Sequence, residues 1–243
     1  LITGGDPLVM NDDHIGAILS ELSCIDHIER IRIGSRTPVV LPQRITDTLM
    51  DTIEKFHEPG KREIALVTHV EHVYEITPEM LEAVQKFKRR GMSVYNQAVF
   101  TVENSRRFEL VALRRALRQI GVDPYYTFNT KGKEETRHFR VPMARLRQEI
   151  KEEARITPGL MRTDEPVYNV PGLGKNYLRA LQHHSLLSIR PDGRRVYEFH
   201  PWEKHLSLAD TFVDIDVSIH EYLKELENRG EDIREYESIW YYF

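Results

Sequence analysis

A lysine between glycines stands in the second half of the chain, in the segment 171–175 with the sequence Pro-Gly-Leu-Gly-Lys. Glycines beside a lysine allow a bulky ring to approach the backbone, and a partly desolvated lysine can form a Schiff base. Lys175 is therefore a candidate for covalent catalysis. A P-loop is excluded, because the spacing differs and Asn176 stands where serine or threonine is required. A solvated lysine in an ordinary glycine-rich loop is the alternative.

A second candidate lies at the start of the chain, where Gly4, Gly5 and Asp6 follow a short apolar run. Two glycines after a strand let a ligand approach the backbone and leave N–H groups free to bind it. The neighbouring carboxylate can take an ammonium group. The segment therefore indicates a ligand-binding loop, with an ordinary turn between a strand and a helix as the alternative.

Three further segments carry polar groups at or inside apolar runs. Arg36 follows Gly-Ser and could hold a carboxylate or phosphate through two hydrogen bonds, or lie on the surface. His69 and His72 have a metal-like spacing, but no third ligand or cysteine cluster accompanies them, so a polar rim or packed histidines is the prediction. Asn96 and Gln97 interrupt an apolar strand, where a buried amide must be hydrogen-bonded by the protein or by a ligand.

The elements that position these residues alternate between two kinds. Apolar, β-branched runs predict strands, amphipathic stretches predict helices, and strands recur about every 30 residues, which is typical of βα units in a parallel sheet. The predicted strands are 1–3, 28–34, 64–69, 93–100 and 124–128, and the predicted helices are 12–22, 43–57, 77–90, 105–120 and 140–154. The polar candidates follow the strands, where barrel enzymes place their chemistry. We therefore predict an α/β fold with a partial TIM-like barrel rather than a doubly wound sheet.

The chain changes character after residue 156, where proline and glycine become frequent. A helix-like stretch at 177–184, a hairpin around Asp192 and Gly193 with a strand at 195–199, and an acidic helix near 215–229 follow. We predict two regions: a partial barrel at 1–156 and a C-terminal α+β extension at 157–243.

The composition excludes several classes of protein. The 243 residues are 40% hydrophobic and 30% charged, with a net charge of −4 and no basic stripe for nucleic acid. No apolar run approaches the ~18 residues of a membrane helix. Cys24 is the only cysteine, so no disulfide framework is expected and a cytoplasmic location is the default. Because Leu1 opens directly on a strand and a glycine turn, we expect further residues upstream.

The order and spacing of these motifs resemble the lysine 2,3-aminomutase family from residue 1 to about residue 180. The matching segments are TGGDPL at 3–8, RIGSRTPVVLPQRIT at 32–46, TH at 68–69, NQAV at 96–99, PYY at 124–126, HFR at 138–140 and PGLGK at 171–175. The resemblance implies a partial TIM-like barrel with an isomerase activity. Such an enzyme uses a [4Fe–4S] cluster, S-adenosylmethionine (SAM) and pyridoxal 5′-phosphate (PLP) to move an amino group from C2 to C3 of an α-amino acid.

The resemblance also implies roles for single residues. Lys175 would be the catalytic PLP lysine. The other implied cofactor residues are Gly4, Gly5 and Asp6 at the methionine end of SAM, Arg36, His69 and Gln97 in the SAM pocket, and Tyr126 near the PLP ring. The implied partners are an amino-acid substrate and a reducing electron donor; we expect a homo-oligomer, without nucleic acid or membrane.

Two departures concern metals. The family's CxxxCxxC loop precedes the TGGDP strand, whereas this sequence begins after it, and Cys24 cannot replace the three thiolates of a cluster. The arginines beside that loop, which serve the PLP phosphate, are absent as well. The zinc cysteines of the lysine enzyme are also lacking, so we predict no metal ligands in these residues. A catalytically inactive binding or scaffold relative is therefore the alternative function.

A third departure concerns the substrate. Lysine-specific members place two aspartates around the substrate ammonium, and the matching positions here are Lys131 and Asn169. A cation and an amide in place of two anions favour an acidic substrate, so we predict glutamate first and lysine next. Alternatively, Lys131 points to solvent. A relative acting on lysine or protein lysine would need an acidic pocket, and a PLP enzyme without radical chemistry would leave the 3–7 segment unexplained.

Overall fold

The computed structural model describes residues 1–130, 134–201, 203 and 205–243. These residues divide into two compact units: unit 1 contains residues 1–97 and 113–125, and unit 2 contains residues 98–112 and 126–243. The division predicted at residue 156 stays a prediction.

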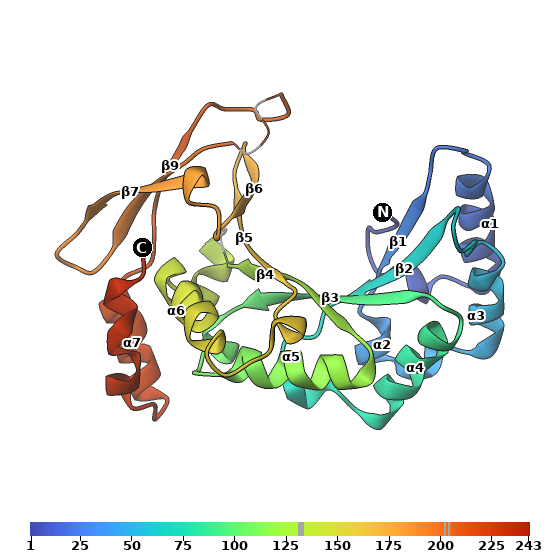
Figure 1. Ribbon diagram of the computed structural model, residues 1–243, viewed down its shortest axis with the longest axis horizontal. Coiled ribbons are helices and arrows are strands. Elements are labelled where there is room, and N and C mark those ends of the chain that lie inside the picture. Colours follow the sequence, from blue (N-terminus) through green and yellow to red (C-terminus); the bar gives the residue numbers. More distant parts are fainter. Residues whose placement is uncertain (131–133, 202, 204) are drawn as a thin grey trace. The chain divides into compact units, whose positions relative to one another are not determined.

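A six-stranded sheet carries the fold, and its strands follow the order of the sequence (Figure 1). The strands are β1 Arg30–Gly34, β2 Glu63–Thr68, β3 Ser93–Phe100, β4 Asp123–Asn129, β5 Glu165–Val170 and β6 Gly174–Tyr177. β1 pairs with β2, β2 with β3 and β4 with β5 in parallel, whereas β5 and β6 form an antiparallel hairpin. A doubly wound sheet reverses its strand order, and this sheet does not. The prediction of an α/β fold with a partial barrel is confirmed.

Helices separate the parallel strands, as expected for βα units. Their bounds are α1 Asp12–Ser23, α2 Thr37–Val40, α3 Asp47–Glu54, α4 Pro78–Arg89, α5 Glu109–Ile120, α6 Met143–Glu153 and α7 Ile219–Asn228. Short 3₁₀ helices complete the loops: η1 Pro7–Val9, η2 Pro42–Arg44, η3 Val73–Glu75, η4 Val102–Asn104, η5 Glu134–Phe139, η6 Gly159–Met161, η7 Leu181–His183 and η8 Ile233–Tyr241. The predicted start of α4 is confirmed, because the Thr77 side chain accepts from Met80 N and Pro78 stands in the first turn. In the part of the chain that is described, no helix is long and apolar enough to cross a membrane.

Side chains of β1 and β2 contribute to the hydrophobic core of unit 1. Ile31 and Ile33 of β1 and Ile64 and Leu66 of β2 are almost fully buried. Burial alternates along β3, so that every second side chain points to the other face of the sheet. This alternation leaves Gln97 on the less buried face.

A second, antiparallel sheet lies in unit 2, with the order β7-β8-β9. Its strands are β7 His184–Ile189, β8 Arg195–Phe199 and β9 Phe212–Ile215. The predicted hairpin at Asp192 and Gly193 is confirmed, since β7 and β8 pair across it and Gly193 has a φ of 78°.

Three predicted elements need correction. The helix at 177–184 is wrong: these residues form the end of β6, η7 and the start of β7, because pairing with β5 satisfies the backbone of β6. The strand at 1–3 is reduced to one parallel bridge between Ile2 and Ile33. The helix at 43–57 begins as η2 and continues only from Asp47 as α3.

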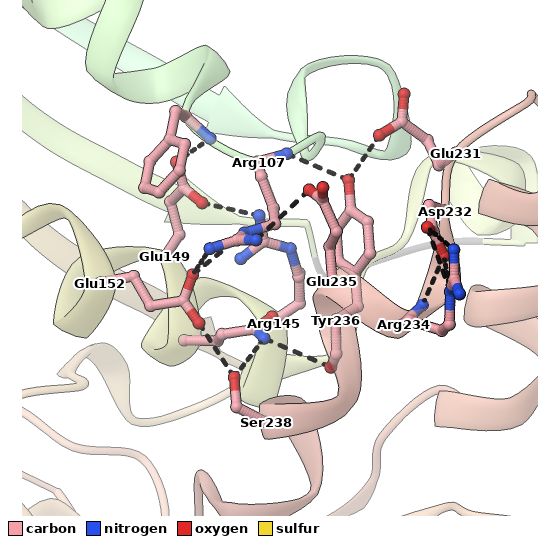
Figure 2. A network of polar contacts seen from close by, with 12 residues as sticks. Arg107, Arg145, Glu149, Glu152, Glu231, Asp232, Arg234, Glu235, Tyr236 and Ser238 are labelled. Carbon is pink, nitrogen blue, oxygen red and sulfur yellow. Dashed lines mark hydrogen bonds and ion pairs between the residues drawn. The ribbon is translucent and has the colours of Figure 1, made fainter.

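A buried polar network centred on α6 connects distant segments of unit 2 (Figure 2). Arg145 and Glu149 form an ion pair of 2.6 Å in which neither side chain is exposed to solvent. Glu149 also accepts from the backbone N–H of Phe108, a non-glycine residue with a φ of 65°. Glu152 accepts from Arg107 at 2.9 Å and from Ser238 of η8 at 2.9 Å. The network therefore fixes the loop before α5 and the 3₁₀ helix η8 to α6.

Candidate functional site

A cavity of about 360 Å³ opens in unit 1 at the carboxyl ends of β1 and β2 and beside Gln97 of β3. It is lined by Leu1, Thr3, Gly5, Asp6, Arg32, Gly34, Ser35, Arg36, Val67, His69 and Gln97, and we call it the strand-end pocket. Five of the predicted site residues lie in it: Gly5, Asp6, Arg36, His69 and Gln97. Gly4 precedes Gly5 without lining the cavity. The strand topology thus gathers residues that are up to 92 positions apart in the sequence (from 5 to 97).

The Asp6 carboxylate is fully used by the protein backbone and one hydroxyl. One oxygen accepts from Leu8 N at 3.0 Å and from Ser35 Oγ at 2.6 Å, and the other accepts from Arg36 N at 2.7 Å and Thr37 N at 3.1 Å. Burial acts to raise the pKa of Asp6, but these hydrogen bonds outweigh it and the pKa lies below its usual value. Asp6 therefore holds the loop after β1 against the glycine turn.

The glycine turn leaves its outer side open. Gly4 and Gly5 have φ angles of 101° and 78°, and a Cβ placed on either would meet no atom within 4 Å. A side chain would therefore be strained by the backbone conformation and would occupy the space through which a ligand could approach.

Arg36 interacts with a carboxylate that was not among the predicted site residues, and its charge also acts on His69. The Arg36 guanidinium forms an ion pair with Glu75 of η3, and Glu75 also accepts from Glu71 N at 2.7 Å. Burial lowers the pKa of His69, and the positive charge of Arg36 lowers it further. His69 therefore stays neutral at pH 7 and can donate from one ring nitrogen and accept at the other.

A second cavity of about 450 Å³ adjoins the strand-end pocket and shares Leu1, Arg32 and Val67 with it. Arg32 Nη1 donates to the hydroxyl of Tyr125 at 3.4 Å, and the Tyr125 ring lies 5.6 Å from that of Tyr95. Sequence reasoning missed Arg32. Side chains two positions apart in a strand point to the same face, so Arg32 lies on the same face of β1 as Gly34. This alternation could have identified Arg32 from the sequence.

The lysine site lies in unit 2, on the β5–β6 hairpin. Lys175 stands opposite Asn169 in the antiparallel register, and its Nζ lies 3.9 Å from the centroid of the Tyr126 ring. Phe128, which the sequence analysis missed, has its ring centroid 5.9 Å from Nζ. Gly174, with a φ of 77°, has open space where a Cβ would stand. Lys175 therefore has aromatic faces on one side and an open backbone beside it. Lys131 lies outside the described residues.

The remaining metal candidates do not form a site. Among the residues that the structure describes, no three His, Cys, Asp or Glu side chains are grouped to hold a metal ion. His72 Nδ1 accepts from Tyr74 N at 3.2 Å at the start of η3. Cys24 is exposed at the end of α1.

Comparisons with known proteins place these features among relatives. No family model matches the chain. The chain is 49% identical over all 243 residues to an uncharacterized KamA family protein of Methanocaldococcus jannaschii, of which it covers 38%. It is 40% identical over 140 residues to glutamate 2,3-aminomutase of Clostridioides difficile and 37% identical over 193 residues to L-lysine 2,3-aminomutase of Bacillus subtilis. It covers 32% and 39% of these two proteins, so the chain spans well under half the length of the relatives it matches.

A sequential βα sheet with a glycine turn and polar strand ends defines an α/β protein of the partial-barrel class. Within that class, this chain is a relative of the lysine and glutamate 2,3-aminomutases, which are isomerases. The resemblance predicted from the motifs is confirmed.

Proposed function

We propose that residues 1–243 form part of a radical SAM, PLP-dependent 2,3-aminomutase, which moves an amino group from C2 to C3 of an α-amino acid. The observation that carries this proposal is the strand-end pocket, where five residues that the resemblance assigns to SAM line one cavity. The names of the matched relatives support the same reaction.

The hydrogen-bond donors and acceptors that line the strand-end pocket suit those of SAM. The open glycine turn offers backbone N–H groups to the methionine carboxylate, and Gln97 and neutral His69 offer both donors and acceptors. An ionised carboxylate has about four acceptor sites, and Asp6 uses all four within the protein. We therefore assign Asp6 the role of holding the turn rather than that of binding an ammonium group directly.

The lysine site offers two features that suit PLP: an amine that can act as a nucleophile and aromatic rings beside it. PLP, when bound, supplies a conjugated aldehyde that activates an amino group. Lys175 would hold that aldehyde, and the rings of Tyr126 and Phe128 would face it. Only a neutral amine attacks an aldehyde, so the Nζ would first release a proton to solvent.

The residues of this chain do not fit an iron–sulfur cluster. A [4Fe–4S] cluster of this type needs three thiolates, and the chain has one cysteine, Cys24, which is exposed on α1. Radical generation is therefore not assigned to residues 1–243. The second candidate function is a relative that binds the small molecules without turnover.

The substrate is proposed to be glutamate, with lysine next. Asn169 lies opposite Lys175 in the hairpin register, where a substrate side chain held at Lys175 could meet it. An amide at that position and the cation Lys131 would attract a side-chain carboxylate and disfavour an ammonium group. Overall identity does not discriminate, because the glutamate enzyme and the lysine enzymes match at 33–40%.

An assay under anaerobic conditions tests this function. A protein containing these residues, reconstituted with iron, sulfide, PLP, SAM and a reductant, should convert glutamate to β-glutamate faster than lysine to β-lysine. Lys131→Asp combined with Asn169→Asp should reverse that preference. Rapid β-lysine formation without β-glutamate would contradict the substrate. SAM and PLP binding without either product would favour the non-catalytic candidate.

A further inference from the structure

Unit 2 contains another cavity, of about 740 Å³, behind the β5–β6 hairpin. Pro166 and Leu178 line it, and Leu178 N donates to Pro166 O beyond the last pair of the hairpin. Successive side chains of a strand point to opposite faces, so these two lie on the face opposite to Lys175 and Asn169. The cavity is therefore separate from the lysine site.

Four cationic side chains line this cavity, which we call the arginine pocket: Arg147, Lys151, Arg162 and Arg179. No aspartate or glutamate lines it. Arg147 and Lys151 stand four residues apart on α6 and share one face of that helix, where like charges destabilise each other. A bound anion would remove this repulsion.

Little within the protein neutralises the four charges. Arg179 has only Glu165, with the nearest nitrogen and oxygen 4.0 Å apart. Arg162 Nε donates to the carbonyl of Thr157 at 2.9 Å, and Arg147 Nη2 donates to the carbonyl of Leu178 at 2.8 Å. Among residues 1–130, 134–201, 203 and 205–243, no ion pair within 4.0 Å is found for Arg147, Lys151 or Arg162.

Arg147 is the most confined of the four. Its Nε is buried and has no hydrogen-bond partner within the described chain. Burial lowers the pKa of Arg147, and the positive charge of Arg195 also lowers it. The neighbouring His184 has a pKa lowered to about 4, first by burial and then by Arg147, so it is neutral at pH 7 and adds no charge of either sign.

Aromatic side chains also line the arginine pocket. Tyr241, Tyr242 and Phe243 line it, and Tyr241 remains 79% exposed. The buried Arg195 holds this wall in place: it donates to the carbonyls of Tyr242 and Trp240, and its guanidinium carbon lies 4.8 Å from the Phe243 ring centroid. The wall therefore offers fixed aromatic faces beside the cations.

We propose that the arginine pocket binds a small organic phosphate that carries an aromatic ring. Four cations without a lining aspartate or glutamate match a phosphate dianion better than a single carboxylate, and guanidinium groups bind phosphate through paired hydrogen bonds. The tyrosine and phenylalanine faces would stack on the ring. The cavity volume lies within the range of small-molecule sites.

The test uses AMP as the probe, with inorganic phosphate and adenosine as its two halves. Titration calorimetry of the 243-residue chain at low ionic strength should give tighter binding for AMP than for either half, and added salt should weaken it. Lys151→Glu combined with Arg179→Glu should weaken AMP binding by about tenfold or more. Both positions are exposed, so the fold is retained, and circular dichroism checks this.

Two control variants make the result specific. Arg155→Glu changes the same charge just beyond α6 without touching the cavity, and Lys175→Ala removes the lysine site; both should leave AMP binding unchanged. Equal weakening by Arg155→Glu would overturn the site in favour of diffuse charge attraction. Loss of binding in Lys175→Ala would place AMP at the lysine site instead. Equal affinities for phosphate and AMP would show that the aromatic side chains do not bind the ring of the ligand. Binding that does not saturate at millimolar AMP would overturn the whole proposal.

Discussion

The chemistry of Lys175 depends on the aromatic rings that surround its ammonium group. A cation at 3.9 Å from the centroid of the Tyr126 ring is stabilised by about 0.5–2 kcal/mol, depending on its exposure to water. The same ring face is available to stack on a planar cofactor once the lysine is covalently bound. Tyr126 would thus contribute both to the resting lysine and to the bound cofactor.

A pair of variants tests this at the residue scale. With PLP added to the chain, an absorbance band of the lysine imine should form, and Lys175→Ala should abolish it because this change removes the amine that forms the imine. Tyr126→Leu should keep the band but raise the PLP concentration for half-saturation by a few-fold to about 30-fold. Lys175→Arg is the matched control, since it keeps the charge and cannot form an imine. A full band in Lys175→Ala would contradict the assignment.

The role of Asp6 depends on distances that its residue type and position do not give. Its position after two glycines predicts an ammonium ligand, but its oxygens accept four hydrogen bonds from the loop after β1 and from the turn itself. The types and order of the residues are compatible with both roles. Only the distances separate a ligand from a residue that positions one.

At the scale of elements, α6 is the helix on which unit 2 depends. Its inner face carries charged side chains where apolar ones would be expected, and they join the loop before α5 to η8 (Figure 2). A buried ion pair adds little net stability over an apolar pair, but the loss of one partner leaves an uncompensated buried charge. The network should therefore be sensitive to single substitutions.

Glu149→Ala is expected to lower the free energy of unfolding by about 3–5 kcal/mol, because Arg145 is left buried without its carboxylate. Urea unfolding followed by circular dichroism measures this loss. Arg145→Met combined with Glu149→Leu should recover most of it. Glu227→Ala on α7 is the control, since Glu227 is exposed and should cost less than about 0.5 kcal/mol. A loss below about 1 kcal/mol for Glu149→Ala would show that the pair is hydrated.

At the scale of the whole molecule, stability should depend on the protonation of Asp216. This carboxylate is buried at the start of α6, where it accepts from Met143 N and Val217 N at 2.8 Å. Burial raises the pKa of Asp216 to about 7, and the negative charge of Asp214 adds to this rise. The two hydrogen bonds and the positive charge of Arg195 oppose the rise without cancelling it. The folded state therefore binds a proton more tightly than the unfolded state. Its stability should fall as pH rises from about 4 to about 7 and change no further from this group above that.

Urea unfolding at pH 5 and pH 8 tests this dependence. The wild-type chain should lose up to about 3 kcal/mol of unfolding free energy from Asp216 between these values. Asp216→Asn should show a smaller pH dependence, because the amide is neutral at both. Asp210→Asn, at an exposed aspartate, should keep the wild-type dependence. Equal slopes for wild type and Asp216→Asn would contradict a raised pKa.

Most of the parallel fold could be predicted from sequence, because local signals and the βα period agree there. Helix α4 Pro78–Arg89 matches the helix predicted at 77–90 within one residue at each end, and β3 Ser93–Phe100 has the predicted bounds. The prediction failed at 177–184, where Tyr177 ends the strand that pairs with β5, η7 follows, and His184 begins the strand that pairs with β8. Strand pairing between distant segments overrides local propensity, and a single sequence does not show which partner is present.

The sequence by itself determined the βα order, the relation to the aminomutases and the candidates Lys175, Asp6, Arg36, His69 and Gln97. These depend on residue type and spacing, which are written in the chain. The tertiary structure alone decided that Asp6 is saturated, that Glu75 pairs with Arg36 and that four cations share the arginine pocket. Hydrogen bonding and charge compensation depend on distances between segments far apart in the chain, so they are fixed only when the chain folds.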